Sequence, residues 1–170
     1  MKQILKLFIV AILMIAFSVK TFAQVSATAT ATATIVTPIA IANAGNMNFG
    51  NVAVSAVAGT VILAPAGTRT VTGGVTLPAT IGTVTAAHFN VTGANNFTYT
   101  ITLPAVATTV TSGGNTMTVN AFTSTPSGTG TLSGAGAQTI DVGATLNVGI
   151  SQAAGTYVSG TPFTVTVNYN

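Results

Sequence analysis

The chain of 170 residues contains no cysteine and no tryptophan, and it carries only four Lys or Arg residues and a single acidic residue. The absence of cysteine excludes a disulfide framework, a thiol nucleophile and a lipid attached to an N-terminal cysteine. Low hydrophobicity and high net charge are typical of disordered chains, and this sequence has the opposite composition. We therefore expect a folded protein whose stability comes from a hydrophobic core.

The residue types that perform most enzymatic chemistry are nearly missing. Asp141 is the sole acidic residue, so it cannot form the carboxylate pair that glycosidases use. One aspartate and one histidine, His88, are too few for a zinc or calcium site. No serine stands in the Gly-x-Ser-x-Gly context that marks many hydrolases. We expect no catalytic residue, no metal site and no cofactor, with His88 at the surface and Arg69 paired with Asp141.

The N-terminal segment predicts a cleaved secretory signal helix over residues 1–23. Lys2 and Lys6 precede an apolar run over residues 7–19, and Thr21-Phe22-Ala23 offers a cleavage site with small residues at its two outer positions. A membrane-spanning helix needs about 20 apolar residues, and Lys20 ends this run too early. We expect a protein exported to the periplasm, the cell surface or the medium, with no transmembrane anchor in the mature form.

Removing this segment takes away three of the four basic residues, because Lys2, Lys6 and Lys20 leave with it. The remaining chain, which would begin at Gln24, is nearly neutral. The high calculated isoelectric point therefore gives no reason to expect a nucleic-acid partner. A neutral surface also lacks the charge repulsion that opposes self-association.

Apolar residues and hydroxyls alternate through much of the sequence, notably over residues 25–35, 98–103, 116–119 and 163–169. Alternation with a period of two predicts β-strands that have one face on a core and one in solvent. Glycine- and asparagine-rich turns separate these runs at short intervals, as in sandwiches and barrels. The six prolines stand where predicted strands end, since a missing N–H costs little there. We expect an antiparallel β-sandwich over residues 38–170.

Aromatic residues offer one route to ligand binding. Phenylalanine is most often a core residue, which leaves Tyr157 and Tyr169 as the candidates for surface contacts. They suggest an alternative function, a self-contained exported binding module, for example for glycans, whose ligand the sequence does not identify.

Several segments in chain order also carry a resemblance to a known family: Asn48-Phe49-Gly50 and residues 89–93, 99–104, 142–146, 154–157 and 160–169. Together they resemble an uncharacterised secreted β-sandwich family of Gram-negative bacteria, a domain of unknown function. That family is similar to spore-coat-protein-U-like domains and to chaperone–usher fimbrial subunits. The resemblance implies an immunoglobulin-like fold and a surface or fimbrial role. It brings no catalytic or cofactor residues.

The resemblance draws attention to residues 24–37, because fimbrial subunits join when one subunit's N-terminal strand is added to the next. The face that would point inward consists of Val25, Ala27, Ala29, Ala31, Ala33 and Ile35. Two interpretations stay open: a donor strand for a neighbouring copy, and the first strand of the chain's own sandwich. We expect a non-catalytic structural or adhesive protein whose partners are copies of itself or other envelope proteins.

Overall fold

The computed structural model describes residues 3–4 and 23–170, which fall in two compact units, Met1–Thr34 and Ile35–Asn170. The predicted signal segment therefore lies almost entirely outside the described residues. Among the residues that are described, none belongs to a helix long and apolar enough to cross a membrane.

Residues 24–37 form no strand, and all of them are exposed. Val25 and Ile35 are 93% and 97% exposed. Their alternation predicted a half-buried strand, yet the segment has no strand partner among the described residues. A β-strand needs the main chain of a neighbour for its hydrogen bonds, so the pattern alone does not fold the segment.

The largest of the three sheets contains eight antiparallel strands: β1 (Ala40–Gly45), β3 (Ala53–Leu63), β4 (Arg69–Thr76), β6 (Ala87–Thr92), β8 (Thr108–Ser112), β9 (Asn115–Thr125), β11 (Ala137–Val148) and β12 (Val158–Ser159). The order is β1-β6-β11-β9-β8-β12, with β3 also paired to β11 and β4 paired to β3. Strand β11 thus has three partners. Its first half pairs with β6 and its second half with β3, while β9 runs along both halves.

Gly143 marks the point where β11 changes partner from β6 to β3. A Cβ atom at this position would collide with the backbone of Leu63 and Ala64. On the neighbouring strand, Ala121 has a positive φ of 47° and adds one residue opposite this point, which forms a β-bulge. Both irregularities lie at the junction between the half of β11 that pairs with β6 and the half that pairs with β3, where one continuous ladder is interrupted.

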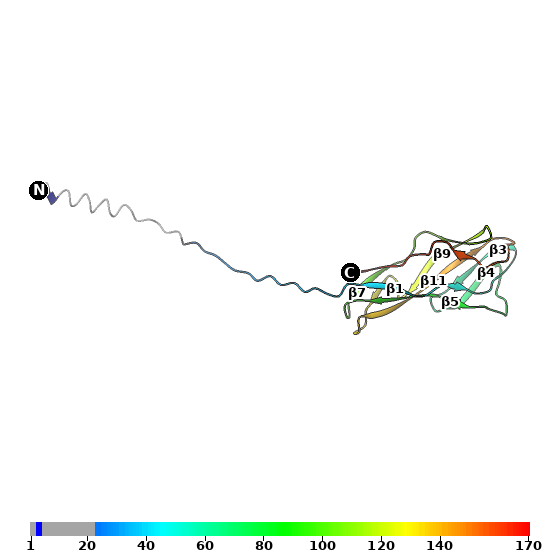
Figure 1. Ribbon diagram of the computed structural model, residues 1–170, viewed down its shortest axis with the longest axis horizontal. Helices are drawn as coiled ribbons and strands as arrows, with labels where there is room; N and C mark the ends of the chain where they lie inside the picture. Colours follow the sequence, from blue (N-terminus) through cyan, green and yellow to red (C-terminus); the bar gives the residue numbers. More distant parts are fainter. Residues whose placement is uncertain (1–2, 5–22) are drawn as a thin grey trace. The chain divides into compact units, whose positions relative to one another are not determined.

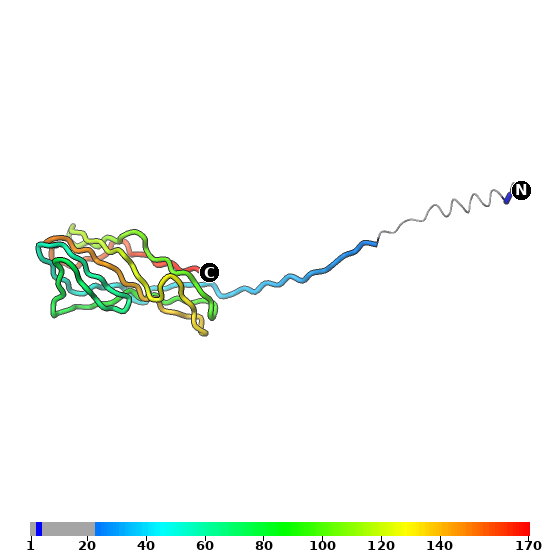
Figure 2. Tube along the Cα trace, turned by 180° about the vertical axis from the view of Figure 1, so that it is seen from behind, coloured from blue at the N-terminus to red at the C-terminus, as the bar shows by residue number. Residues whose placement is uncertain are grey.

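Two smaller sheets complete the fold. One has the order β10-β7-β13, formed by Thr129–Thr131, Thr98–Thr102 and Thr166–Tyr169. The other is a pair of two-residue strands, β2 (Asn48–Phe49) and β5 (Val84–Thr85). Figures 1 and 2 show, from opposite sides, that the C-terminus lies at the end of the sandwich where β1 begins. The predicted all-β, antiparallel sandwich is confirmed, and all six prolines lie outside its strands.

The alternating residues divide between solvent and two core clusters. The first cluster joins β6 and β11 of the large sheet to β7 and β13 of the small one, with Tyr99, Val91 and Ile140 fully buried. The second lies beneath β3, β4, β9 and the second half of β11, around Val61 and Leu146. Apolar burial of this kind is the main favourable term in folding, and here every residue of both clusters lies between 61 and 167.

One hydrogen-bonded group crosses the first cluster. The Tyr99 hydroxyl, on β7, donates to Gln138 Oε1, on β11, at 2.6 Å. The same oxygen accepts the backbone N–H of Thr131, on β10, at 2.9 Å. Burial raises the pKa of Tyr99, so its hydroxyl stays a proton donor. The two sheets are therefore linked by a satisfied polar contact in addition to apolar packing.

Gly130 makes this contact sterically feasible, because a Cβ atom there would overlap the ring and hydroxyl of Tyr99. We predict that Gly130→Ala lowers the free energy of unfolding by about 1–3 kcal/mol, as overpacking of a core does. Gly134→Ala is the matched control in the next turn, where nothing lies within 4 Å of an added Cβ. It should change stability by less than about 0.5 kcal/mol. Urea unfolding of both variants checks this, and equal effects would contradict the steric role of Gly130.

Candidate functional site

The charged residues that follow the predicted signal segment do not gather at one place. Arg69 Nη1 donates to the carbonyl oxygens of Phe49 and Asn51, the latter at 3.1 Å. Asp141 instead contacts His88, with Oδ1 and Nδ1 2.5 Å apart. The predicted Arg69–Asp141 pair is therefore wrong. Its physical reason is register: Asp141 stands directly opposite His88 on the neighbouring strand, whereas Arg69 begins β4.

The His88–Asp141 contact is partly exposed, with the side chains 44% and 36% accessible. It resembles the pair that orients a histidine for nucleophilic catalysis. The outer-face row that contains it reads Gly45, His88, Asp141 and Thr125 across four strands. Gly45 occupies the side of His88 away from Asp141 and supplies no side chain. The row thus provides no nucleophile next to the imidazole.

Metal ligands are equally sparse. Within residues 3–4 and 23–170, no group of three His, Cys, Asp or Glu side chains comes together. Every buried side-chain nitrogen or oxygen in the same part of the chain has a hydrogen-bond partner. No orphaned polar atom therefore points to a missing ligand there.

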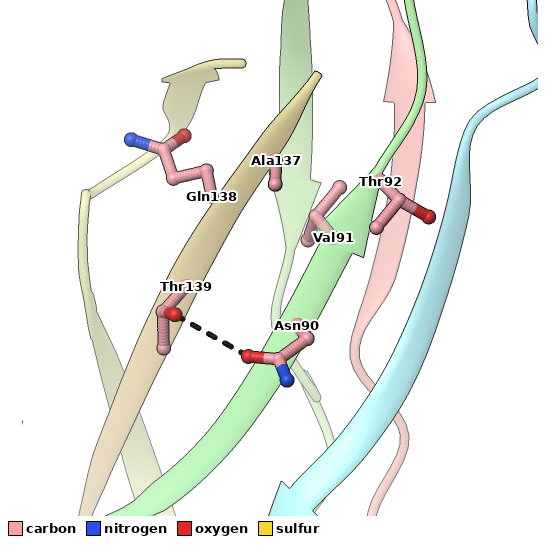
Figure 3. A pocket seen from close by; sticks show the side chains of 6 residues that line it. All are labelled: Asn90, Val91, Thr92, Ala137, Gln138 and Thr139. Atoms are coloured by element: carbon pink, nitrogen blue, oxygen red, sulfur yellow. Dashed lines mark hydrogen bonds between the residues drawn. The ribbon is translucent and has the colours of Figure 1, made fainter. Parts of the chain in front are cut away.

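A shallow depression of about 470 Å³ lies over the ladder between β6 and β11 (Figure 3). Its lining is uncharged and non-aromatic: Asn90, Val91, Thr92, Ala137, Gln138 and Thr139. The Thr139 hydroxyl donates to Asn90 Oδ1 at 3.3 Å across the two strands. None of these six side chains can serve as a general acid or base at neutral pH, so the depression offers hydrogen bonding and no more.

Tyr157 and Tyr169, the candidates for surface contacts, are half-buried and lie in separate segments. The Tyr157 hydroxyl accepts a hydrogen bond from Gln152 Nε2 at 2.9 Å and donates to the carbonyl of Ala153 at 2.8 Å. It closes the loop that follows β11. Its polar end is already occupied by the protein itself.

Tyr169 lies at the end of β13 and forms hydrogen bonds with two other segments of the chain. Its hydroxyl accepts the backbone N–H of Ala94 at 2.6 Å and donates to the carbonyl of Thr37 at 2.8 Å. Phe97 packs edge-on against the ring, with centroids 5.5 Å apart. No local sequence pattern indicates this contact, because Thr37 and Tyr169 are far apart in the chain. Its effect is to fix the main chain just before β1.

The sheet edges are the remaining candidates. Strands β1 and β12 end the main path of the large sheet, β4 forms another edge, and β10 and β13 flank the small sheet. Beside β1, Ile39 and Ile41 pack against the first core cluster while staying partly exposed, as does Phe163 before β13. Free main-chain donors and acceptors at such edges are templates for a further strand.

Removing the Tyr169 hydroxyl tests its hydrogen bond with the backbone N–H of Ala94. In Tyr169→Phe the buried N–H of Ala94 loses its acceptor, which costs about 1–3 kcal/mol. We expect the exchange of the Ala94 amide to accelerate by about 5- to 150-fold, measured by NMR. Tyr157→Phe is the control and should leave Ala94 unchanged. Equal protection of Ala94 in both variants would contradict the assignment.

The residues of the sandwich match a protein-family model. A family model described as a domain of unknown function (DUF4402) matches residues 39–169, which includes every strand of the sandwich. No curated protein and no solved structure matches the chain. The match begins just after the exposed segment and ends one residue before the C-terminus. The chain belongs to the family of the domain of unknown function DUF4402.

Proposed function

We propose that this protein is a non-catalytic structural or adhesive subunit of the cell surface, pilus-like, that assembles by β-strand addition. Residues 24–37 act as the donor strand for another copy. The predicted signal peptide directs the protein out of the cytoplasm, to the periplasm, the surface or the medium. The likeness to chaperone–usher and spore-coat-protein-U-like domains belongs to this proposal and rests on the short sequence segments alone.

One observation carries the proposal. An uncharged segment with the alternation of a strand precedes a sandwich that has free strand edges, and this segment is exposed along its whole length. Exposed apolar side chains such as Val25 and Ile35 are costly in water. Pairing with a neighbour's sheet would bury them and satisfy the main chain of the segment.

The size of the donor side chains indicates how such a strand would be held. Four buried alanine methyls contribute roughly 3 kcal/mol, at about 0.8 kcal/mol for each carbon. Four large aliphatic side chains would contribute about 6–12 kcal/mol. The centres of both core clusters are already closed to solvent, with Tyr99, Ile140 and Val61 fully buried. Addition along an edge, held by main-chain hydrogen bonds and by Ile35, therefore fits better than filling a deep groove.

The scarcity of charge supports the same function. Natural sheet edges are commonly protected by lysine, proline or inward-pointing charges. Among residues 24–170 the ionisable residues of this kind are Arg69, Asp141 and His88. Arg69 is bound to carbonyl groups, and the other two face each other. Apart from Arg69 at the start of β4, the edge strands carry no charged side chain, which leaves them open to pairing with other copies.

The glycan-binding module is less well supported as a function. The hydroxyls of Tyr157 and Tyr169 are engaged within the protein. The depression between β6 and β11 lacks an aromatic platform on which a sugar ring could stack.

The donor role predicts that assembly depends on residues 24–37. We expect residues 24–170 to form multimers or filaments in size-exclusion chromatography and negative-stain microscopy. Residues 38–170 should be a folded monomer, because they contain the whole core. Their Tm should fall only slightly, since the truncation removes the Thr37 carbonyl that accepts the Tyr169 hydroxyl. A peptide of residues 24–37 should bind this monomer. The same peptide with Thr30→Pro and Ala31→Pro, which removes one main-chain donor from each edge of the strand, should not.

Two results would overturn the donor role. One is a strictly monomeric chain of residues 24–170. The other is assembly by residues 38–170 that equals that of the longer chain.

A further inference from the structure

We propose that the free edge of β1 is the acceptor, and that the donor comes from a second copy of the chain. This inference rests on the proposed function and assigns its docking surface. In the assembly the large sheet would gain one strand beside β1, from residues 24–37 of the neighbour.

The edges differ in length and in charge. Strands β10, β12 and β13 have three, two and four residues, and β1 has six. Strand β4 has eight residues, but it begins at Arg69. A register shift interrupts its pairing with β3, and another interrupts the pairing of β1 with β6 between Asn43 and Gly45, so regularity does not separate these two edges. An added strand gains main-chain hydrogen bonds in proportion to the length of the edge. Strand β1 contains neither charge nor proline and is the longest of the uncharged edge strands, so it is the best template among these edges.

The side chains of β1 suit a small-residue donor. Ala40 and Ala42 point outward, opposite Thr92 and Asn90 of β6, and both are exposed. Ile39, just before the strand, and Ile41 on the opposite face pack against the first core cluster and stay partly exposed. Alanines of the donor would cover these two isoleucines, and Ile35 would add the largest contact. The donor threonines would then extend the hydroxyl-bearing outer face of the sheet.

The contact of Tyr169 with Thr37 favours a second copy over the chain's own segment. To lie beside β1 of its own domain, the chain would have to reverse direction between Val36 and Ile39. The Thr37 carbonyl is held by the Tyr169 hydroxyl, and Pro38 fixes its own φ near −65°. A tight reversal there would break the Tyr169 contact, which a donor from another copy leaves intact.

Disulfide trapping tests the acceptor directly, because the natural chain has no cysteine. Directly opposite residues on neighbouring strands have Cβ atoms about 4.5–5.5 Å apart, and a small shift brings them to the roughly 3.5–4.5 Å of a disulfide. The protein of residues 24–170 carrying Ala42→Cys is mixed with the same protein carrying Thr28→Cys, Thr30→Cys or Thr32→Cys, and oxidised. One of the three mixtures should give a disulfide-linked heterodimer, because donor threonines and Ala42 share the outer face.

Two sets of control variants test whether the disulfide is specific to the outer face of the donor and to β1. Ala29→Cys and Ala31→Cys in the donor place the thiol on the opposite face and should not link to Ala42→Cys. Asn168→Cys on β13, which is also exposed at a strand edge, should not link to any donor variant. Links to Asn168→Cys but not to Ala42→Cys would overturn the assignment of β1.

Double variants that combine Ala42→Cys with Thr32→Cys or Thr34→Cys test the second copy at high dilution, because a reversal between Val36 and Ile39 would bring residues 32–34 beside Ala42. We expect no internal disulfide, whereas closure within one chain, with no heterodimer in the mixtures, would show that the segment pairs with its own β1.

Lysine on the two edges gives an independent readout. Ala42→Lys and Asn168→Lys place a charge at exposed positions, so Tm should be unchanged in both. We expect Ala42→Lys to weaken multimer formation by about tenfold or more, because charged side chains block edge pairing. Asn168→Lys should keep multimer formation near the level of the unsubstituted protein. If assembly needs residues 24–37 but neither lysine nor trapping involves β1, the acceptor assignment fails while the donor role stands.

Discussion

The main-chain hydrogen bonds of β11 are the interaction on which the rest of the sandwich depends. This strand holds β6 and β3 on one edge, in succession, and β9 on the other. The change of partner at Gly143 divides the protein into two halves, each with its own core cluster. Gln138, near the start of β11, then ties the large sheet to the small one through Tyr99 and Thr131. Any strand added to the sandwich must join a framework that β11 has already completed.

That completeness shapes the proposed assembly. A domain that lacked a core strand would expose the inner face of its neighbours, whereas here the centres of both clusters, at Tyr99, Ile140 and Val61, are fully buried. What the domain leaves open is main-chain hydrogen bonding at its edges, and in particular along β1. The chain supplies a matching segment in residues 24–37, rich in threonine and alanine and free of charge. Weak side-chain burial combined with regular main-chain pairing suits a filament made of many identical contacts.

Much of the fold could be predicted from the sequence, because the period of two is a local property. The alternation over residues 98–103 and 116–119 correctly identified parts of β7 and β9. The same pattern over residues 25–35 predicted a half-buried strand that has no partner among the described residues, since alternation reports the shape of a strand and not its neighbour. Phe163 and Val165 alternate into the core but precede the ladder, which begins at Thr166.

The contacts between segments that are distant in the chain could not be predicted from local sequence patterns. Asp141 could be assigned to Arg69 from charge alone, and only the strand register places it against His88. Tyr169 was a candidate for surface contacts because of its residue type. In the fold its hydroxyl is instead hydrogen-bonded to Ala94 and Thr37. In each case the deciding information is the order of strands in the sheet, which no short window of sequence contains.

Amide hydrogen exchange of residues 25–35 in the assembled protein tests the central claim most directly. Successive N–H groups of a strand point to opposite edges, and addition at a single edge bonds every second one. We predict protection that alternates with a period of two along this segment, together with slow exchange in β1. Fast exchange at every amide of residues 25–35, in an assembly that persists, would contradict the account.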